Sequence, residues 1–546
     1  MKFTKPFYLS AALAVALTSC KSVQTLPDLS DMTPIKSVDN LTTRKTDLSE
    51  DQLKRWSHLD ILRDTVPGMS VDRAYESIIK KKKGQKVLVA VIDSGIEIDH
   101  EDLKHAIYTN PNEIAGNGID DDQNGFIDDI HGWNFLGESN AENLELTRIV
   151  KKGDDGSEQY KEAKAELEKK LAELEPLGVR VEQFKKMRST VAEYVGKDKF
   201  NKEDLANIPE DAPDEVKAGA SLFMNLYMAG VDGYDYIDDM SDYYSSQVDY
   251  NLNVNFDGRA IVGDNPDDIN DTDYGNNDVL GDRDHAKHGT HVAGIIGQAR
   301  GNGLGGDGVA SKNVEIMSVR AVPDGDEYDK DVALAIRYAA DNGAKVINGS
   351  FGKYFAQHSE WVYDAIKYAA EKDVLIVVAA GNDSMDLNPV EGEEIKRYPN
   401  DRKVGERDEI SDNFLVVGAL NPTFGEKMVA EFSNFGHVDV DVFAPGVKIY
   451  ATVPHGEYEF LQGTSMASPN AAGVAAMIRS YYPSLTAPEV KQIMKESGVP
   501  VNFDVIVSGD SSDKRNFQDI STSGKFVNLY NALIMADKVT RAKAQK

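Results

Sequence analysis

Runs of consecutive branched apolar residues recur along the chain, and amphipathic patterns lie between them. The apolar runs occupy residues 86–92 ("KVLVAVI"), 314–322, 345–347, 374–379 and 414–417. Such continuous apolarity predicts strands buried on both faces, as in a parallel sheet. Helical periodicity occurs at residues 331–341, 360–371 and 465–479. Alternation of the two patterns predicts an α/β domain with a doubly wound, mostly parallel sheet.

Two stretches interrupt this alternation. Residues 111–131 are dense in Asp, Asn and Gly, and residues 150–230 form a charged helical insertion without a strand-like run. In the insertion, one apolar stripe precedes Pro176 and Gly178, and a second follows them. The stripes are Tyr160, Ala163, Leu167, Leu171, Leu174 and then Leu177, Val181, Phe184, Val191, Tyr194. Because proline and glycine interrupt helices, this pattern predicts an antiparallel helical hairpin.

The N-terminal stretch "MKFTKPFYLSAALAVALTSC" has the pattern of a targeting segment. Two lysines precede an apolar run that is too short for a permanent membrane span, so residues 1–19 are predicted to be a signal peptide. The end of this stretch resembles the bacterial lipoprotein box, in which the cysteine is lipidated. This resemblance implies a palmitate-bearing anchor at Cys20, and a protein held to a membrane of the bacterial cell envelope, outside the cytoplasm. An ordinary secretory signal is the alternative.

After this segment, residues 20–55 are polar and are predicted to be a tether or a short pro-segment, and one globular domain is predicted over residues 56–540. The chain has 546 residues, of which 41% are apolar, and a net charge of −31. This charge argues against a nucleic-acid partner and favours divalent cations or cationic substrates. Cys20 is the single cysteine, so no thiol remains for catalysis, disulfides or zinc.

Three motifs far apart in the sequence each present a side chain at the end of a predicted element. "VAVIDSG" ends a strand in Asp93, "DRDHAKHGTHVAG" contains His285, His288 and His291, and "GTSMASPNAAGVAAM" begins a helix near Ser465. Taken singly, Asp93 and Ser465 have the residue types of ordinary helix caps. The three histidines at i, i+3 and i+6 drift around a helix, which disfavours one zinc ion bound by all three.

Together these motifs resemble the subtilisin-like serine peptidases, whose Asp, His and Ser signatures occur in the same order. A fourth stretch, "VVAAGND", matches the segment that supplies the oxyanion-hole asparagine at Asn382. The resemblance covers residues 56–135 and 250–535. It implies a nucleophilic Ser465, a general base His288 and an orienting Asp93, acting on protein or peptide substrates through an acyl-enzyme intermediate. His291 matches a structural position, and His285 has no assigned role.

The same resemblance implies where a peptide substrate binds. An extended peptide would add as a strand beside Ser350, Phe351 and Gly352, and Ala380 and Gly381 would line the first specificity pocket. Gly349, in "VINGSFG", stands where the family commonly has a larger residue.

Calcium is the predicted cofactor, in a structural role. The stretch "GIDDDQNGFIDDIHG" resembles the first nine positions of an EF-hand loop, although His131 stands at the twelfth position in place of glutamate. The candidate ligands are Asp120, Asp122, Asn124, Asp128 and Asp129. A polar turn without a cation is the alternative. The family resemblance further implies a calcium site that includes Asp102 and Asn302.

The leading hypothesis is therefore a calcium-stabilised, lipid-anchored serine endopeptidase. A catalytically silent binding lipoprotein with the same fold is one alternative, and a zinc hydrolase is another. The intact set of Asp93, His288, Ser465 and Asn382 favours the enzyme, because proteins that have lost such an activity usually lose one of these residues.

Overall fold

A computed structural model describes residues 26–388, 397–403, 406 and 408–545. Its strands are β1 (Val87–Asp93), β2 (Gly132–Asn134), β3 (Val314–Arg320), β4 (Val346–Gly349), β5 (Leu375–Ala379), β6 (Phe414–Leu420), β7 (Val442–Pro445), β8 (Ile449–Val453), β9 (Glu457–Leu461), β10 (Val499–Pro500), β11 (Asp504–Ile506), β12 (Lys514–Asn516) and β13 (Lys525–Phe526). The signal peptide predicted at residues 1–19 and Cys20 lie outside the described residues.

The helices are α1 (Glu50–Leu53), α2 (Ile61–Asp64), α3 (Val71–Ala74), α4 (Glu145–Lys152), α5 (Glu158–Val195), α6 (Lys202–Ala206), α7 (Asp214–Met228), α8 (Gly233–Ser246), α9 (Arg259–Val262), α10 (Lys287–Gly297), α11 (Asp329–Asp341), α12 (Ser359–Glu371), α13 (Thr464–Tyr481), α14 (Ala487–Ser497) and α15 (Leu529–Ala544). Among the described residues, no helix is both long enough and apolar enough to cross a membrane.

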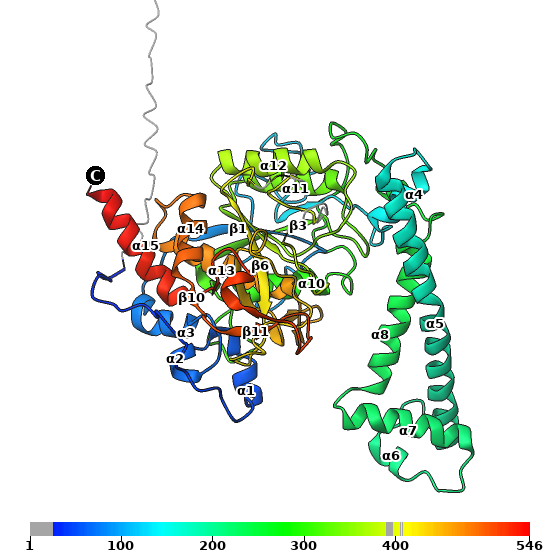
Figure 1. Cartoon of the computed structure of the whole chain (residues 1–546). Helices are drawn as coiled ribbons and strands as arrows, with labels where there is room; N and C mark the ends of the chain where they lie inside the picture. The colour runs from blue at the N-terminus through cyan, green and yellow to red at the C-terminus, as the bar shows by residue number, and fades with distance from the viewer. Residues whose placement is uncertain (1–25, 389–396, 404–405, 407, 546) are drawn as a thin grey trace, which may run out of the picture.

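The central sheet confirms the predicted fold class. Its nine strands run in the order β10-β13-β7-β6-β5-β4-β1-β3-β2, and every pair except β10 with β13 is parallel. The five apolar runs seen in the sequence became β1, β3, β4, β5 and β6, which are almost wholly buried. Helices α11 and α12 lie together over the sheet, and α10 and α13 lie across its other face (Figure 1).

The insertion forms an arm, α5 to α8, that projects away from the sheet (Figure 1). The predicted hairpin turn at Pro176 is wrong, because Pro176 lies inside α5, which is one uninterrupted helix of 38 residues. Pro176 lies on the exposed face of α5, where water can bind the carbonyl that proline leaves without a partner. Gly178 instead allows α5 to lie close to α8, because a Cβ at this position would lie 2.6 Å from the Tyr244 ring.

Two small apolar cores hold the arm. The core near the sheet includes Leu146, Ile149, Leu167 and Leu174, and the core at the far end includes Val191, Phe223 and Ile237. Most residues of both predicted stripes are therefore buried against α4, α7 and α8, whereas Leu171 and Tyr194 remain exposed.

The described part of the predicted tether, residues 26–55, differs from a solvated linker. Leu29, Ile35 and Val38 are at most 4% exposed and belong to the main core. The N–H of Leu29 donates to Asp537 Oδ2, and that of Ile35 donates to Asn531 Oδ1, both on α15. The apolar residues of this polar segment pack beside the C-terminal helix α15. Their spacing in the sequence did not predict this packing.

Candidate active site

The residues singled out by the three motifs meet at one edge of the sheet. Asp93 is the last residue of β1, Ser350 follows β4, and Ala380 follows β5. These are the carboxyl ends of adjacent parallel strands, and the chain connectivity reverses direction between β1 and β4. In open α/β sheets such a switch point opens a crevice that binds ligands.

Asp93 and His288 form a hydrogen-bonded pair. His288 Nδ1 lies 2.7 Å from Asp93 Oδ1, which also accepts the Ser94 N–H at 2.8 Å. Asp93 is 1% exposed. Gly289 lets α10 come this close, because a Cβ at that position would lie 2.2 Å from the Gly95 carbonyl oxygen. Burial lowers the pKa of His288, but the charge and hydrogen bond of Asp93 outweigh it, so the pKa is raised overall.

Ser465 stands in the first turn of α13. Its Oγ donates to the Ser350 carbonyl oxygen at 3.1 Å, and Ser350 Oγ donates to the Ser465 carbonyl oxygen at 2.8 Å. Within the described contacts, the Ser465 hydroxyl makes this bond rather than one to His288. Ser468, one turn later, anchors α13 to the sheet through Asn348 Oδ1 at 2.8 Å.

Asn382 is oriented by its neighbour in space, Thr464. The Thr464 N–H and Oγ both donate to Asn382 Oδ1 at 2.9 Å, which leaves the amide N–H groups for the cleft. Gly463 has φ of +150°, and a Cβ there would stand 3.6 Å from Asn382 Nδ2 and 3.5 Å from the Ser465 N. Glycine therefore keeps open the space that these two donors share.

A cavity of about 540 Å³ joins all these groups. It is lined by every residue predicted for catalysis and substrate binding: Asp93, His288, Ser465, Asn382, Ser350, Phe351, Gly352, Ala380 and Gly381. Sequence reasoning missed Arg397, Lys353 and the segment 323–327, which line the same cavity. The segment could have been found from its position, since it follows β3 at the same sheet edge as Asp93.

The three histidines of the opening motif have separate partners. His285 is exposed and its Nδ1 lies 3.1 Å from Asp282 Oδ1. His291 is fully buried, and its Nε2 lies 3.0 Å from the Ile449 carbonyl oxygen. Burial lowers the pKa of His291 to about 3, so it is neutral at physiological pH. His285 and His288 both line the cavity, and of these two it is His288 that is hydrogen-bonded to Asp93.

The acidic loop at 111–131 gathers a different set of carboxylates from the one expected. Oxygen atoms of Glu113, Asp120 and Asp122 lie within 4.8 Å of one another. Asp128 instead accepts the N–H groups of residues 116, 117 and 118. The predicted ligands Asn124 and Asp129 bond to each other, and Asp129 also accepts Tyr338 Oη at 2.6 Å.

Glu113 was missed because it precedes the EF-hand-like stretch. Its Oε1 accepts the N–H groups of Asp121 and Asp122 at 2.8 and 3.0 Å, while its Oε2 is buried without a hydrogen bond among the described residues. The second predicted pair is in contact: Asn302 Nδ2 donates to Asp102 Oδ1 at 2.6 Å. Asp102 Oδ2 is likewise buried and without a hydrogen bond in the part of the chain described.

Comparison with protein families matches residues 84–518 to the family described as "Subtilase family". A "Thermophilic serine proteinase" of Bacillus sp. (strain AK1) is 38% identical over 236 residues, which are 43% of this chain and 50% of that protein. The "Cell wall-associated protease" of Bacillus subtilis (strain 168) is 37% identical over 43% of this chain and 23% of its own length. "Subtilisin DY" of Bacillus licheniformis is 36% identical over 37% of this chain and 67% of its own length.

Among solved structures, one titled "S41 Psychrophilic Protease" aligns with a TM-score of 0.38 and 30% identity over 47% of this chain and 81% of that one. The first two relatives are thus matched over only a quarter to a half of their own length. The family match, by contrast, extends from just before β1 to beyond β12 and contains Asp93, His288, Asn382 and Ser465. This chain belongs to the subtilase family.

Proposed function

We propose that the protein is a serine endopeptidase that hydrolyses peptide bonds through Asp93, His288 and Ser465. The observation that carries the proposal is that these three side chains and Asn382 line one cavity, with His288 bonded to Asp93 at 2.7 Å. A hydroxyl is a poor nucleophile at neutral pH, so His288 takes the Ser465 proton as the serine attacks the substrate carbonyl. The attack requires the Ser465 hydroxyl to turn from the Ser350 carbonyl toward His288 Nε2.

Each remaining group then has a chemical task. Asp93 fixes the imidazole tautomer and stabilises the imidazolium. The Asn382 amide and the Ser465 N–H donate to the oxyanion of the tetrahedral intermediate. His288 returns the proton to the leaving amine, which gives an acyl-enzyme, and then activates the water that hydrolyses it. The substrate backbone adds as a strand beside Ser350 to Gly352, and its side chain enters the pocket at Ala380 and Gly381.

The test is Ser465→Ala in the full chain. Wild-type protein should react with a fluorophosphonate probe and cleave a protein substrate, and the variant should do neither while keeping the wild-type circular dichroism spectrum. A wild-type protein that binds polypeptides but takes no probe would instead be the silent binding protein. Cleavage that persists in the variant and stops with a zinc chelator would indicate a zinc hydrolase.

Calcium fits the acidic loop on the chemistry of its donors. Glu113, Asp120 and Asp122 bring three carboxylates together, and the orphaned Glu113 Oε2 is a hard oxygen ligand without another partner among the described residues. Bound calcium would neutralise the repulsion among these groups. A second ion would use Asp102, whose Oδ2 is equally orphaned. Both sites belong to the proposal, in a structural role.

The proposal includes an envelope location. The lipoprotein box ending in Cys20 supports a lipid anchor. Metabolic labelling with palmitate should mark the wild-type chain and leave Cys20→Ser unlabelled.

A further inference from the structure

One wall of the catalytic cavity is held by the base of the arm rather than by the sheet. Residues 323, 324, 325 and 327 line the cavity, in the segment between β3 and α11. Both ends of the arm form hydrogen bonds with residues 324–327 of this segment, termed the 324–327 wall. The chain enters the arm through residues 140–148, which include the start of α4, and leaves it through residues 246–251.

Asp324 forms hydrogen bonds with residues at both ends of the arm. Its N–H donates to the Asn140 carbonyl oxygen, and its own carbonyl oxygen accepts the Glu142 N–H, each at 2.8 Å. From the exit side, Asn251 Nδ2 donates to the same carbonyl oxygen at 3.1 Å, and Ser246 Oγ donates to Asp324 Oδ2 at 2.6 Å. The backbone and the side chain of Asp324 are therefore both fixed by the arm.

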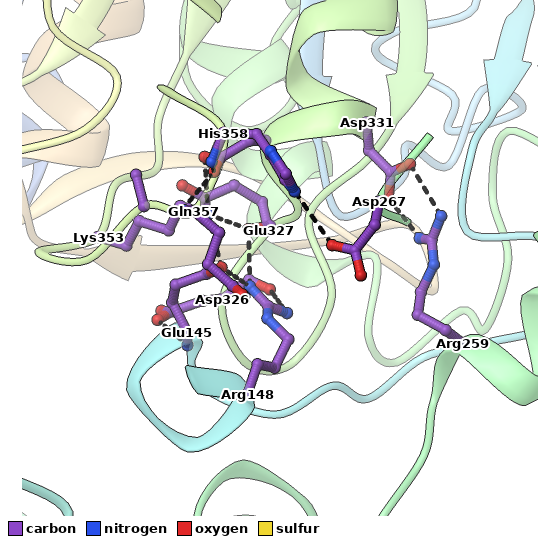
Figure 2. Close-up of polar contacts among 12 residues, drawn as sticks. Glu145, Arg148, Arg259, Asp267, Asp326, Glu327, Asp331, Lys353, Gln357 and His358 are labelled. Atoms are coloured by element: carbon purple, nitrogen blue, oxygen red, sulfur yellow. Dashed lines mark hydrogen bonds and ion pairs between the residues drawn. The ribbon is translucent and has the colours of Figure 1, made fainter. Parts of the chain in front are cut away.

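Asp326 and Glu327 are bonded by two residues of α4 (Figure 2). The Glu145 N–H donates to Asp326 Oδ2 at 2.7 Å. The Arg148 guanidinium spans two successive carbonyl oxygens, with Nη1 at 2.8 Å from that of Asp326 and Nη2 at 3.0 Å from that of Glu327. Arg148 also stacks on the Tyr328 ring at 3.8 Å. Because the planar guanidinium binds two successive carbonyl oxygens, it fixes the backbone orientation of the 324–327 wall as well as its position.

Lys353 links this wall to the opposite side of the cavity. It follows directly after Ser350, Phe351 and Gly352, and its side chain is 1% exposed. Its Nζ donates to Glu145 Oε2 at 2.8 Å and to the Glu327 carbonyl oxygen at 2.7 Å, and it pairs with Asp329 at 2.9 Å. Figure 2 shows Glu145 between the two cations, Arg148 and Lys353.

The charges of Glu145, Arg148 and Lys353 compensate one another. Burial raises the pKa of Glu145, but Arg148 and Lys353 outweigh it and lower the pKa to about 2. Burial lowers the pKa of Lys353, but Asp329 and Glu145 raise it well above its ordinary value. All three groups are charged at neutral pH, so removing one leaves a buried charge without its partner.

Helix α4 carries the arm on its other side. Leu146 and Ile149, each one position after Glu145 and Arg148, pack in the apolar core with Leu167 and Leu174 of α5. Phe355, two residues beyond Lys353, packs against the same core. A shift of α5 would therefore displace α4 and, through its hydrogen bonds, the 324–327 wall, because close-packed side chains cannot move independently.

We propose that Glu145 and Arg148 are positioning residues for polypeptide substrates, through which the arm sets the 324–327 wall of the cleft. The inference rests on the proposed peptidase function and adds the class of substrate concerned. Chains long enough to lie along the wall depend on it, whereas small reagents that reach only Ser465 do not.

The experiment compares Glu145→Gln and Arg148→Lys with wild type, using an internally quenched octapeptide and a small fluorophosphonate probe. The expected result is a rise in KM for the octapeptide on the order of tenfold or more, since misplacement by an ångström is costly. The kcat should stay within about threefold, and the rate of probe labelling within about twofold. Glu409→Gln is the matched control, because it removes one of the two carboxylates paired with the buried Lys491, at 2.6 Å, outside this cluster.

Leu167→Ala tests transmission without touching the cleft or the ion pairs. It removes side-chain contacts between α5 and α4. It should also raise the KM for the octapeptide, by a smaller factor than the charge variants. This variant also serves if either charge variant fails to give a wild-type circular dichroism spectrum.

Three outcomes overturn the inference. Octapeptide KM values at the wild-type level in folded Glu145 or Arg148 variants would show that the wall needs no support from α4. An equal fall in probe labelling and octapeptide cleavage would assign these residues a general structural role. An effect of Glu409→Gln as large as that of Glu145→Gln would do the same. Wild-type protein that takes no probe would refute the peptidase function itself, which is a separate result.

Discussion

His288 is held on one side by a carboxylate and faces the cleft on the other. Its side chain is 39% exposed, whereas that of Asp93 is 2% exposed. The ion pair is therefore shielded from solvent at Asp93 only, and the imidazole remains accessible for proton transfer. Its titration should control the activity at neutral pH.

The pKa of His288, raised above its ordinary 6.5 by Asp93, predicts the pH dependence. His288 acts as a base only when neutral, so kcat/KM should fall as the pH drops, with a midpoint above 6.5. Replacing Asp93 by Asn removes the stabilising charge and should lower the imidazole pKa, which NMR titration of the His288 ring can follow. A midpoint below 6.5 in wild type, or an unchanged imidazole pKa in the variant, would contradict this assignment.

Asn382→Ala tests the oxyanion donor. We expect kcat to fall by about a hundred- to a thousandfold with little change in KM, the magnitude known for such an asparagine in subtilisin, a relative in this family. Asn434→Ala is a poor control because Asn434 Nδ2 donates to the carbonyl oxygen of Ala380, which lines the cavity. Asn207→Ala, at an exposed position that does not line the cavity, is a better one. A loss confined to KM would mean that Asn382 binds substrate without stabilising the transition state.

Among the elements, the acidic loop and the arm show how much local sequence leaves open. In the loop, Glu113, which the alternating Asp and Asn pattern did not include, joins Asp120 and Asp122 in one carboxylate cluster. In the arm, apolar periodicity predicts helix correctly, but the break at Pro176 does not occur. An exposed proline costs α5 a hydrogen bond without creating a buried orphan, so packing on both sides can carry the helix through.

Calcium removal should lower the melting temperature of the folded protein. Bound ion stabilises by RT ln(1 + [L]/Kd), about 2.7 kcal/mol at a hundredfold excess over Kd. Differential scanning calorimetry with chelator and with restored calcium provides the measurement. Glu113→Gln should reduce the calcium-dependent part of the shift, and Glu168→Gln, at an exposed position of α5, should not. A melting temperature that is the same with and without calcium would show that the acidic loop is only a polar turn.

At the scale of the whole molecule, the two ends of the described chain stabilise each other. Residues 26–41 lie beside α15, and the segment containing α1 to α3 completes the core beneath the sheet (Figure 1). The N-terminal segment therefore belongs to the folded domain and closes a surface that α15 would otherwise expose.

Leu29→Ala tests this closure. Leu29 is 1% exposed, so truncation should destabilise the fold by roughly 2–5 kcal/mol, as for other buried leucines. Urea denaturation followed by circular dichroism gives the value, with the exposed neighbour Ser30→Ala as the control. A change below about 0.5 kcal/mol, typical of surface substitutions, would show that the segment contributes little to stability.

The sequence by itself determined the alternating α/β fold, because continuous apolar runs can be buried only between helical layers. It also singled out Asp93, His288, Asn382 and Ser465, because the motifs around them together resemble those of the subtilisin-like peptidases and occur in the same order. Only the tertiary structure decided what depends on pieces distant in sequence. Arg148 contacts carbonyl oxygens 178 and 179 positions away, and Leu29 bonds to a residue 508 positions away. Neither contact has a local pattern, because a carbonyl group is present at every residue and an apolar side chain fits any groove of the right shape.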